Sequence, residues 1–101
     1  MVIRIINHLR TWSSYSDGEV IFKLIDSAFA QGKSAQVSFF GIRSVPSAFI
    51  NSALIRLLER YEFAFIRKNL QILDSTRQIN SLIKDRFEFA ARGQNETAPP
   101  A

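Results

Sequence analysis

The stretch VSFFGIRSVPSAFINSALIRLLERY, from Val37 to Tyr61, contains a short apolar run, an isolated glycine at Gly41 and a serine-bearing turn. Val45 precedes Pro46, which favours an extended residue followed by a helix start, since proline has no N–H to lose there. A helical apolar face follows, made of Phe49, Ala53, Leu54, Leu57, Leu58 and Tyr61. The spacing places Ser52, Arg56, Glu59 and Arg60 on the outward face. This stretch therefore predicts a strand, a turn and a long helix.

Further strands and helices are predicted on both sides of this unit. Strands are predicted over residues 2–6, 11–15, 35–40 and 70–73. Helices are predicted from a capping box at Ser16 and Glu19 to a stop at Gly32, over 62–69, and from a second capping box at Ser75 and Gln78. Because parallel strands need crossover helices, this alternation predicts an α/β fold: a small, mixed or partly parallel sheet of about four strands with helices packed over it.

The composition predicts a single globular domain. The chain has 101 residues, 47% of them hydrophobic, so it can bury one modest core. Its end, ARGQNETAPPA, is small, polar and rich in proline. We therefore expect a domain over 1–91 and a flexible tail over 92–101. Neither a membrane-spanning run nor a secretory signal is recognisable, which favours a cytoplasmic protein.

The residue types that carry chemistry are sparse. The chain has no cysteine and one histidine, His8, so we expect no metal site and no thiol chemistry. The glycines are isolated and no nucleophile elbow is present, so no phosphate-cradling loop and no catalytic serine are expected. We therefore expect a protein that is not an enzyme and has no cofactor.

Two segments resemble a known family. The run VSFFGIRSVPSAF is similar to the signature of STAS domains, in which a strand enters a Gly-Val turn and a serine opens the next helix. The run RKNLQILDSTRQINSLIKDRF, over 67–87, brings the chain closer to STAS-like proteins of bacteria and phages. The likeness covers most of residues 16–90 and so includes the layout of the fold.

This resemblance implies a signalling role. STAS domains that act as anti-sigma-factor antagonists dock onto a kinase of the histidine-kinase-like ATPase fold, which phosphorylates the serine and so abolishes docking. Residue by residue, Ser47 matches that phosphorylated serine, and Gly41 with Ile42 matches the Gly-Val turn. Pro46 and Ser38 stand where those proteins usually carry acids, which is a departure from the pattern.

Two functions therefore remain from the sequence. The first is a regulatory protein-interaction module, with a docking surface formed by Gly41, Arg43, Ser44, Ser47, Asn51 and Ile55. The alternative is a nucleic-acid-binding regulator, based on the net charge of +4 and on Arg43, Arg56, Arg60 and Arg67. The sequence leaves open whether the chain is a monomer or a homodimer formed through an open sheet edge.

Overall fold

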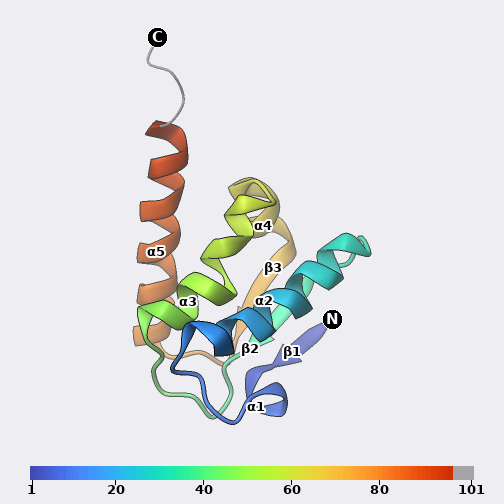
Figure 1. The fold of residues 1–101 in the computed structure, drawn as a ribbon, viewed down its shortest axis with the longest axis vertical. Helices are drawn as coiled ribbons and strands as arrows, with labels where there is room; N and C mark the ends of the chain where they lie inside the picture. Colours follow the sequence, from blue (N-terminus) through green and yellow to red (C-terminus); the bar gives the residue numbers. More distant parts are fainter. Residues whose placement is uncertain (97–101) are drawn as a thin grey trace.

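The computed structural model describes the backbone of residues 1–96 and the side chains of residues 1–92. The strands are β1 (Val2–Arg4), β2 (Ala35–Ser38) and β3 (Leu70–Leu73) (Figure 1). The helices are α1 (Ile5–His8), α2 (Tyr15–Ala30), α3 (Ser47–Ala53), the 3-10 helix η1 (Ile55–Glu59), α4 (Phe63–Asn69) and α5 (Arg77–Glu96). The predicted α/β class is confirmed, and so are the predicted strand over 70–73 and the helix that precedes it.

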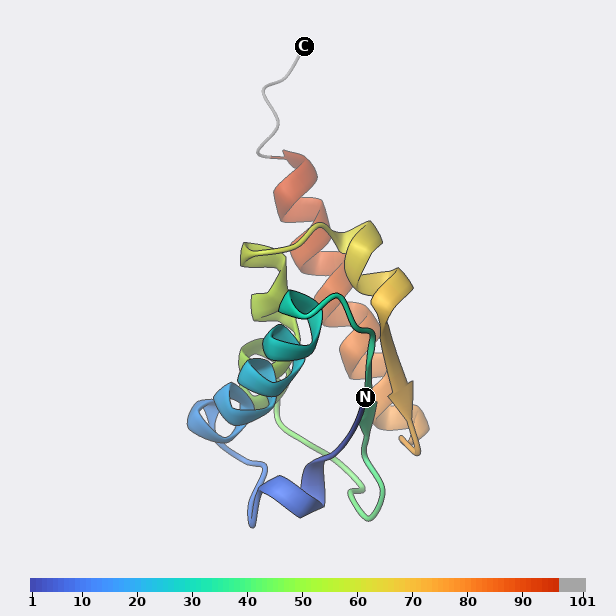
Figure 2. The same ribbon diagram turned by 90° about the vertical axis from the view of Figure 1, so that its right-hand side faces the viewer.

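The sheet is parallel and has helices on one side. Its order is β1-β2-β3, and Ile3, Val37 and Ile72 lie beside one another across it. Both crossovers run in the same direction along the sheet, and crossovers of parallel strands are almost always right-handed. All the crossover helices therefore fall on one face, as Figure 2 shows. The sheet consists of three strands in the described residues, close to the predicted number.

The core lies between this face and the helices. It includes the central strand residues Ala35 and Val37 together with the inner faces of α2, α3 and α5. The fully buried large side chains are Phe39, Phe49, Ile3, Ile5, Ile21, Ile25, Ile50, Leu54, Leu57, Ile66, Ile79 and Val37. Most of the predicted apolar faces of the helices are thus confirmed as core.

The N-terminal region differs from the prediction. The first strand ends at Arg4 and continues as the short helix α1, and residues 11–14 form a loop in place of the predicted strand over 11–15. The capping box that opens α2 is made by Ser14 and Asp17, so the prediction of Ser16 and Glu19 was wrong. Both serines are followed by an acid three residues later, and local spacing cannot choose between them.

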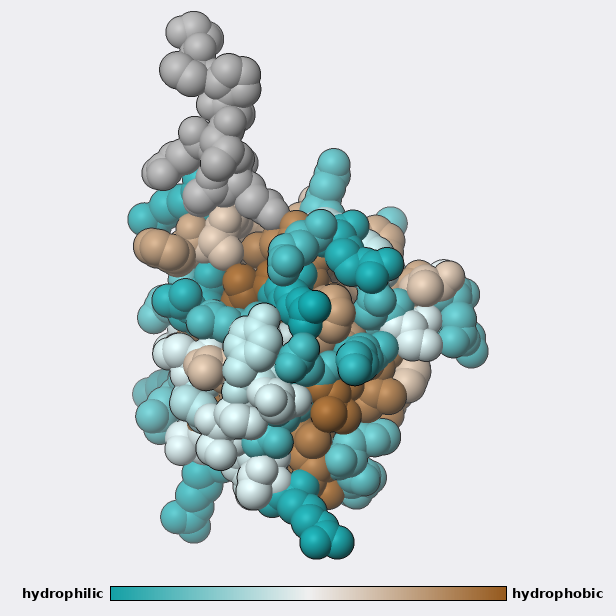
Figure 3. All heavy atoms as spheres, viewed as in Figure 1, coloured by the Kyte–Doolittle hydropathy of each residue, from teal (hydrophilic) through white to brown (hydrophobic). Residues whose placement is uncertain are grey.

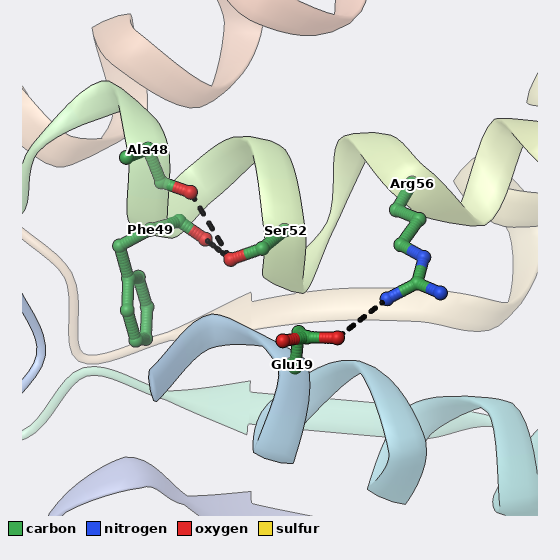
Figure 4. A network of polar contacts seen from close by, with 5 residues as sticks. All are labelled: Glu19, Ala48, Phe49, Ser52 and Arg56. Atoms are coloured by element: carbon green, nitrogen blue, oxygen red, sulfur yellow. Dashed lines mark hydrogen bonds and ion pairs between the residues drawn. The ribbon is translucent and has the colours of Figure 1, made fainter. Parts of the chain in front are cut away.

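The predicted long helix after the turn is divided in two. Helix α3 ends at Ala53, and after Leu54 the chain continues as the tighter helix η1. Ser52, predicted to face outward, is fully buried against α2. Its hydroxyl donates to the carbonyls of Ala48 and Phe49 at 3.0 and 3.2 Å (Figure 4), so burial leaves no unsatisfied polar group.

The C-terminal helix also starts differently. Thr76 caps α5, since its Oγ1 accepts from the N–H of Ile79 at 3.2 Å, whereas the hydroxyl of Ser75 donates to Asn80. The predicted capping box of Ser75 and Gln78 was therefore wrong. Helix α5 continues to Glu96, beyond the predicted start of the tail at Arg92, and residues 97–101 lie outside the described part.

Candidate partner-binding surface

The turn between β2 and α3 has a defined backbone shape. The N–H of Ile42 donates to the carbonyl of Phe39 at 2.9 Å, and Gly41 has φ of +81°. A positive φ at the third residue of such a turn is the type II pattern, which favours glycine. Ile42 is buried whereas Gly41 is exposed, so the turn is fixed to the core by one side chain. The predicted glycine turn is confirmed.

Two sets of side-chain hydrogen bonds connect this loop to β3 and α5. The hydroxyl of Ser38, at the end of β2, donates to Asp74 Oδ2 at 2.7 Å and accepts from the N–H of Phe40 at 3.2 Å. Thr76 Oγ1 donates to the carbonyl of Arg43 at 3.0 Å. Because the carboxyl ends of adjacent parallel strands meet at the same edge, residues 36 apart in the chain come together here.

The predicted docking residues do not form one continuous set. Gly41, Arg43, Ser44 and Ser47 are exposed, whereas Asn51 and Ile55 are half-buried. Ser47 is the first residue of α3, and its N-cap, Pro46, has no side chain that could bond the first amides. Ser44 makes no capping bond either. Ser47 lies in a shallow groove that also includes Asp85 of α5.

Asn51 and Ile55 lie in a second groove, which we call the α3–α5 groove. It has a volume of about 400 Å³ and is lined by Tyr15, Asn51, Ile55, Arg56, Leu58, Glu59 and Ala90. The Nε of Arg86 donates to Asn51 Oδ1 at 3.1 Å, which fixes the amide at the groove wall. Tyr15 is half exposed at its rim, with 50% of its surface accessible. The groove thus combines apolar walls with a ring, an amide and opposite charges.

Arg56, in this groove, and Arg60 both have carboxylate partners. Arg56 forms an ion pair with Glu19 at 3.1 Å (Figure 4), and its guanidinium lies over the ring of Phe22. Arg60 pairs with Asp26 at 3.3 Å. Of the four arginines behind the nucleic-acid hypothesis, these two therefore already have carboxylate partners.

Asp26 also accepts a hydrogen bond from the hydroxyl of Tyr61 at 2.7 Å. Burial of the phenol raises the pKa of Tyr61 above its ordinary value of 10.0, and the bond to Asp26 raises it further. The ring of Tyr61 stacks on Phe65 and meets Phe29 edge-on. These contacts give Tyr61 a structural role.

Sequence reasoning did not place Tyr15 or Asp74 in the candidate site. Tyr15 was placed in a strand, and its position at the rim follows only from the start of α2. Asp74 directly follows a predicted parallel strand, just as the loop after Ser38 follows the neighbouring one. That placement at the carboxyl ends of adjacent strands was a usable signal for the Ser38–Asp74 bond.

The polar cluster around Asp17 caps the start of α2. Asp17 accepts from the hydroxyl of Thr11 at 2.8 Å and from the N–H groups of Ser13 and Ser14. These bonds lower the pKa of Asp17, the one from Thr11 contributing most. Among the residues described, no group of three or more potential metal ligands comes together. Within the same residues, no helix has both the length and the apolar character that crossing a bilayer requires.

The fold and the surface define a small α/β module with one helix-covered face and shallow grooves. A family model described as a STAS-like domain of unknown function matches residues 17–80. The match covers more than half of the chain, which therefore belongs to the STAS-like family. No curated protein and no solved structure matches it. Family membership supports, at this level, a regulatory module that binds proteins.

Proposed function

We propose that the chain is a non-catalytic regulatory module that binds a protein partner through the turn and helices from Gly41 to Arg60. The observation that carries this proposal is the α3–α5 groove, in which Asn51 and Ile55 lie beside the exposed ring of Tyr15. Clefts that combine a half-exposed aromatic ring with apolar walls and a few polar groups are suited to anchoring a partner side chain.

The partner that we propose is an ATPase of the histidine-kinase-like fold, as the resemblance to STAS domains implies. A fixed turn supports docking, because a partner then does not have to order it. The bonds from Ser38 to Asp74 and from Thr76 to Arg43 provide this rigidity. Asp74 also brings a carboxylate to the strand end where Ser38 stands in place of the usual acid.

Phosphorylation of Ser47 is the proposed switch. The hydroxyl is exposed at the first residue of α3, in the groove that also contains Asp85. A phosphate would add roughly −1.5 to −2 charges. It would therefore place like charges next to each other across this groove and make the surface unfavourable for an acidic or apolar partner.

Affinity capture from the native host, followed by mass spectrometry, tests the docking surface. Tyr15→Ala is the preferred variant, because Asn51 and Ile55 also contact the body of the protein and their substitution would disturb folding. We expect Tyr15→Ala to lose an ATPase that the wild-type chain captures. Phe89→Ala is the matched control, since Phe89 is an aromatic residue with 69% of its surface exposed on α5. Equal capture by all three chains would show that docking takes place elsewhere.

The switch is tested separately. Phosphopeptide mapping of protein from its native host is expected to find Ser47 modified, and Ser47→Asp is expected to weaken capture while Ser47→Ala retains it. Capture unchanged by Ser47→Asp, with no modified Ser47 in the host, would remove the switch and leave the docking proposal standing.

The nucleic-acid alternative has less support. Arg56 and Arg60 are paired with carboxylates, and the guanidinium of Arg67 lies 5.9 Å from the ring centroid of Phe63. Retention on DNA or RNA that fell steeply with salt would nevertheless favour it over the protein-binding function.

A further inference from the structure

The outer edge of β3 carries neither the charges nor the proline that often protect a sheet edge. β3 is the last strand in the order β1-β2-β3, so one side of it has no strand neighbour in the described residues. Its sequence is LQIL, without charge, proline or glycine, whereas the opposite edge strand, β1, carries the exposed Arg4. Natural sheets usually place charges or proline on open edges to prevent pairing with another chain. The β3 edge is therefore available for a further strand.

The hydrogen bonds of the sheet determine which backbone groups point outward. The N–H of Phe39 donates to the carbonyl of Leu73 at 2.9 Å, so that carbonyl points toward β2. Because successive peptide units of a strand point to opposite sides, the carbonyls of Leu70 and Ile72 point to the open edge. The N–H groups of Ile72 and Asp74 point the same way. The N–H of Leu70 is already used, since it donates to the carbonyl of Ile66 at the end of α4.

We propose that two copies of the chain associate through these edges, with their β3 strands antiparallel and Ile72 on the two-fold axis. The N–H of Ile72 would donate to the carbonyl of the partner subunit's Ile72. The N–H of Asp74 would donate to the carbonyl of the partner subunit's Leu70. By the two-fold symmetry, the outward N–H groups of Ile72 and Asp74 and the outward carbonyls of Leu70 and Ile72 each take part in one hydrogen bond. A register centred on Gln71 would instead need the N–H of Leu70, which α4 already occupies.

The charges at the two ends of β3 favour the same orientation. Arg67 and Lys68 precede the strand, and Asp74 directly follows it. Antiparallel pairing brings the basic end of one strand beside the acidic end of the other, twice per dimer, whereas parallel pairing would bring like charges together. The edge is thus complementary to a second copy of itself in both hydrogen bonding and charge.

Apolar surface beside the strand would be covered at the same time. A groove of about 470 Å³ lies along β3 and is lined by Phe63, Ile66, Arg67, Leu70, Ile72, Ile83, Lys84, Phe87 and Glu88. Leu70 and Ile72 form its strand wall and are only half-buried in the single chain. In the proposed dimer Ile72 meets the partner subunit's Ile72 at this wall, and the two sheets become one continuous sheet.

Disulfide trapping tests the register, because the natural chain contains no cysteine. With Ile72 on the axis, Gln71 faces the partner subunit's Leu73 in a pair without backbone hydrogen bonds, with Cα atoms about 4.5 Å apart, within disulfide range. An oxidised mixture of Gln71→Cys and Leu73→Cys chains is expected to form a covalent dimer of one chain of each kind. Gln71→Cys alone is expected to form little, since two copies of residue 71 lie diagonally, about 7–8 Å apart. A mixture of Gln36→Cys and Leu73→Cys is the matched control and is expected to stay uncrosslinked.

Sedimentation velocity over a range of concentrations tests the association itself. The wild-type chain is expected to show a concentration-dependent dimer, and Ile72→Lys to lose it, because two ammonium groups would face each other on the axis. Val2→Lys, on the other edge strand, is the control that retains the dimer, and circular dichroism checks that both variants fold. A wild-type chain that is monomeric at every concentration would overturn the proposal. The chain would also be monomeric if the edge binds a segment of a different protein, and the proposal would then be wrong as well. A dimer that persists in Ile72→Lys would overturn it equally.

Discussion

The contact between α2 and α3 and the outer edge of β3 are two regions of the same apolar layer, packed in different ways. At the first, Gly18 is buried against α3, and the neighbouring Phe49 and Ser52 are fully buried. At the second, Leu70 and Ile72 remain half-buried beside an open groove. Figure 3 shows that the surface of the molecule on the side seen in Figure 1 carries apolar patches bordered by hydrophilic side chains. The apolar side chains of the first region are fully buried within the chain, whereas those of the second region stay partly exposed.

The difference shows where the stability of this fold resides and where its surface is free to bind. Close packing of α2 on α3 depends on a glycine and on a serine whose hydroxyl is satisfied by its own helix. The β3 edge has residues of the same apolar type but no element to cover them. We therefore expect substitutions in the first region to affect the free energy of unfolding most, and substitutions in the second to affect association.

The largest expected difference is between two leucine truncations. Leu57→Ala, at a fully buried site, is expected to lower the free energy of unfolding by about 4 kcal/mol, since it removes buried methyl groups and leaves a cavity. Leu70→Ala, at the half-buried edge, is expected to cost about 1 kcal/mol in the monomer. Urea denaturation at a concentration where the chain is monomeric measures both. Equal losses would mean that the edge is as tightly packed as the core.

Gly18→Ala is expected to destabilise by about 3 kcal/mol through overpacking. A Cβ at this position would lie 1.8 Å from the hydroxyl of Ser52 and 2.6 Å from the carbonyl of Phe49. Helix propensity alone predicts the opposite sign, because alanine is the better helix former. Gly32→Ala is the control: it has a φ of +75° but no close neighbour, so only backbone strain of about 1 kcal/mol is expected. The denaturation midpoints of the two variants distinguish overpacking at position 18 from backbone strain at position 32.

Tyr61→Phe is expected to cost about 1 kcal/mol, because it removes the hydrogen bond to Asp26 while keeping the aromatic contacts. The raised pKa of Tyr61 gives this effect a pH signature. The neutral phenol is favoured in the folded state, so the contribution of the hydroxyl is fully present below pH 10.0 and is lost as pH rises through the higher pKa of the folded state. Thermal unfolding of both chains from neutral to alkaline pH measures it. If the difference in stability between the two chains disappeared already at neutral pH, the effect could not be assigned to ionisation of Tyr61.

The smallest expected effect is acid sensitivity at the start of α2. The pKa of Asp17 is lowered in the folded chain, so its carboxylate stabilises the fold above its ordinary value of 3.8, and this contribution disappears as pH falls through the lower pKa of the folded state. We therefore expect Asp17→Asn to lower the melting temperature at neutral pH and to match the wild type in strong acid. Asp85→Asn, which removes an exposed charge elsewhere, is the control. A difference independent of pH would mean that the charge is not what stabilises the cap.

The sequence alone predicted the elements with clear periodicity and the turns with special residues. Gly32 has the positive φ expected of a helix stop, Gly41 lies in a turn as predicted, and the strand over 70–73 is present. The errors concern choices that local patterns cannot make. The start of α2 offers two serines with an acid at the right spacing, and the structure uses Ser14.

The environment of Ser52 illustrates a second limit of sequence reasoning. Helical spacing placed this residue outward, but Gly18, on another helix, allows α3 to approach so closely that the serine is buried. Whether such a glycine and serine meet depends on which helices pack together, and helix propensity carries no information about that packing. In the candidate site, exposure of the turn and of Ser47 agreed with expectation, whereas the groove at Tyr15 arises from three separate segments of the chain.

The hydrogen bond from Thr76 to the carbonyl of Arg43 has a mechanical consequence. The same hydroxyl oxygen holds the loop and caps α5, a helix of 20 residues. A force applied to the loop is therefore transmitted to one end of a stiff rod, whose outer turns lie at the α3–α5 groove. Displacing the loop would break the bond to Arg43 and free the hydroxyl that also accepts from the N–H of Ile79, so a change in amide exchange in the first turn of α5 would report whether the loop is held.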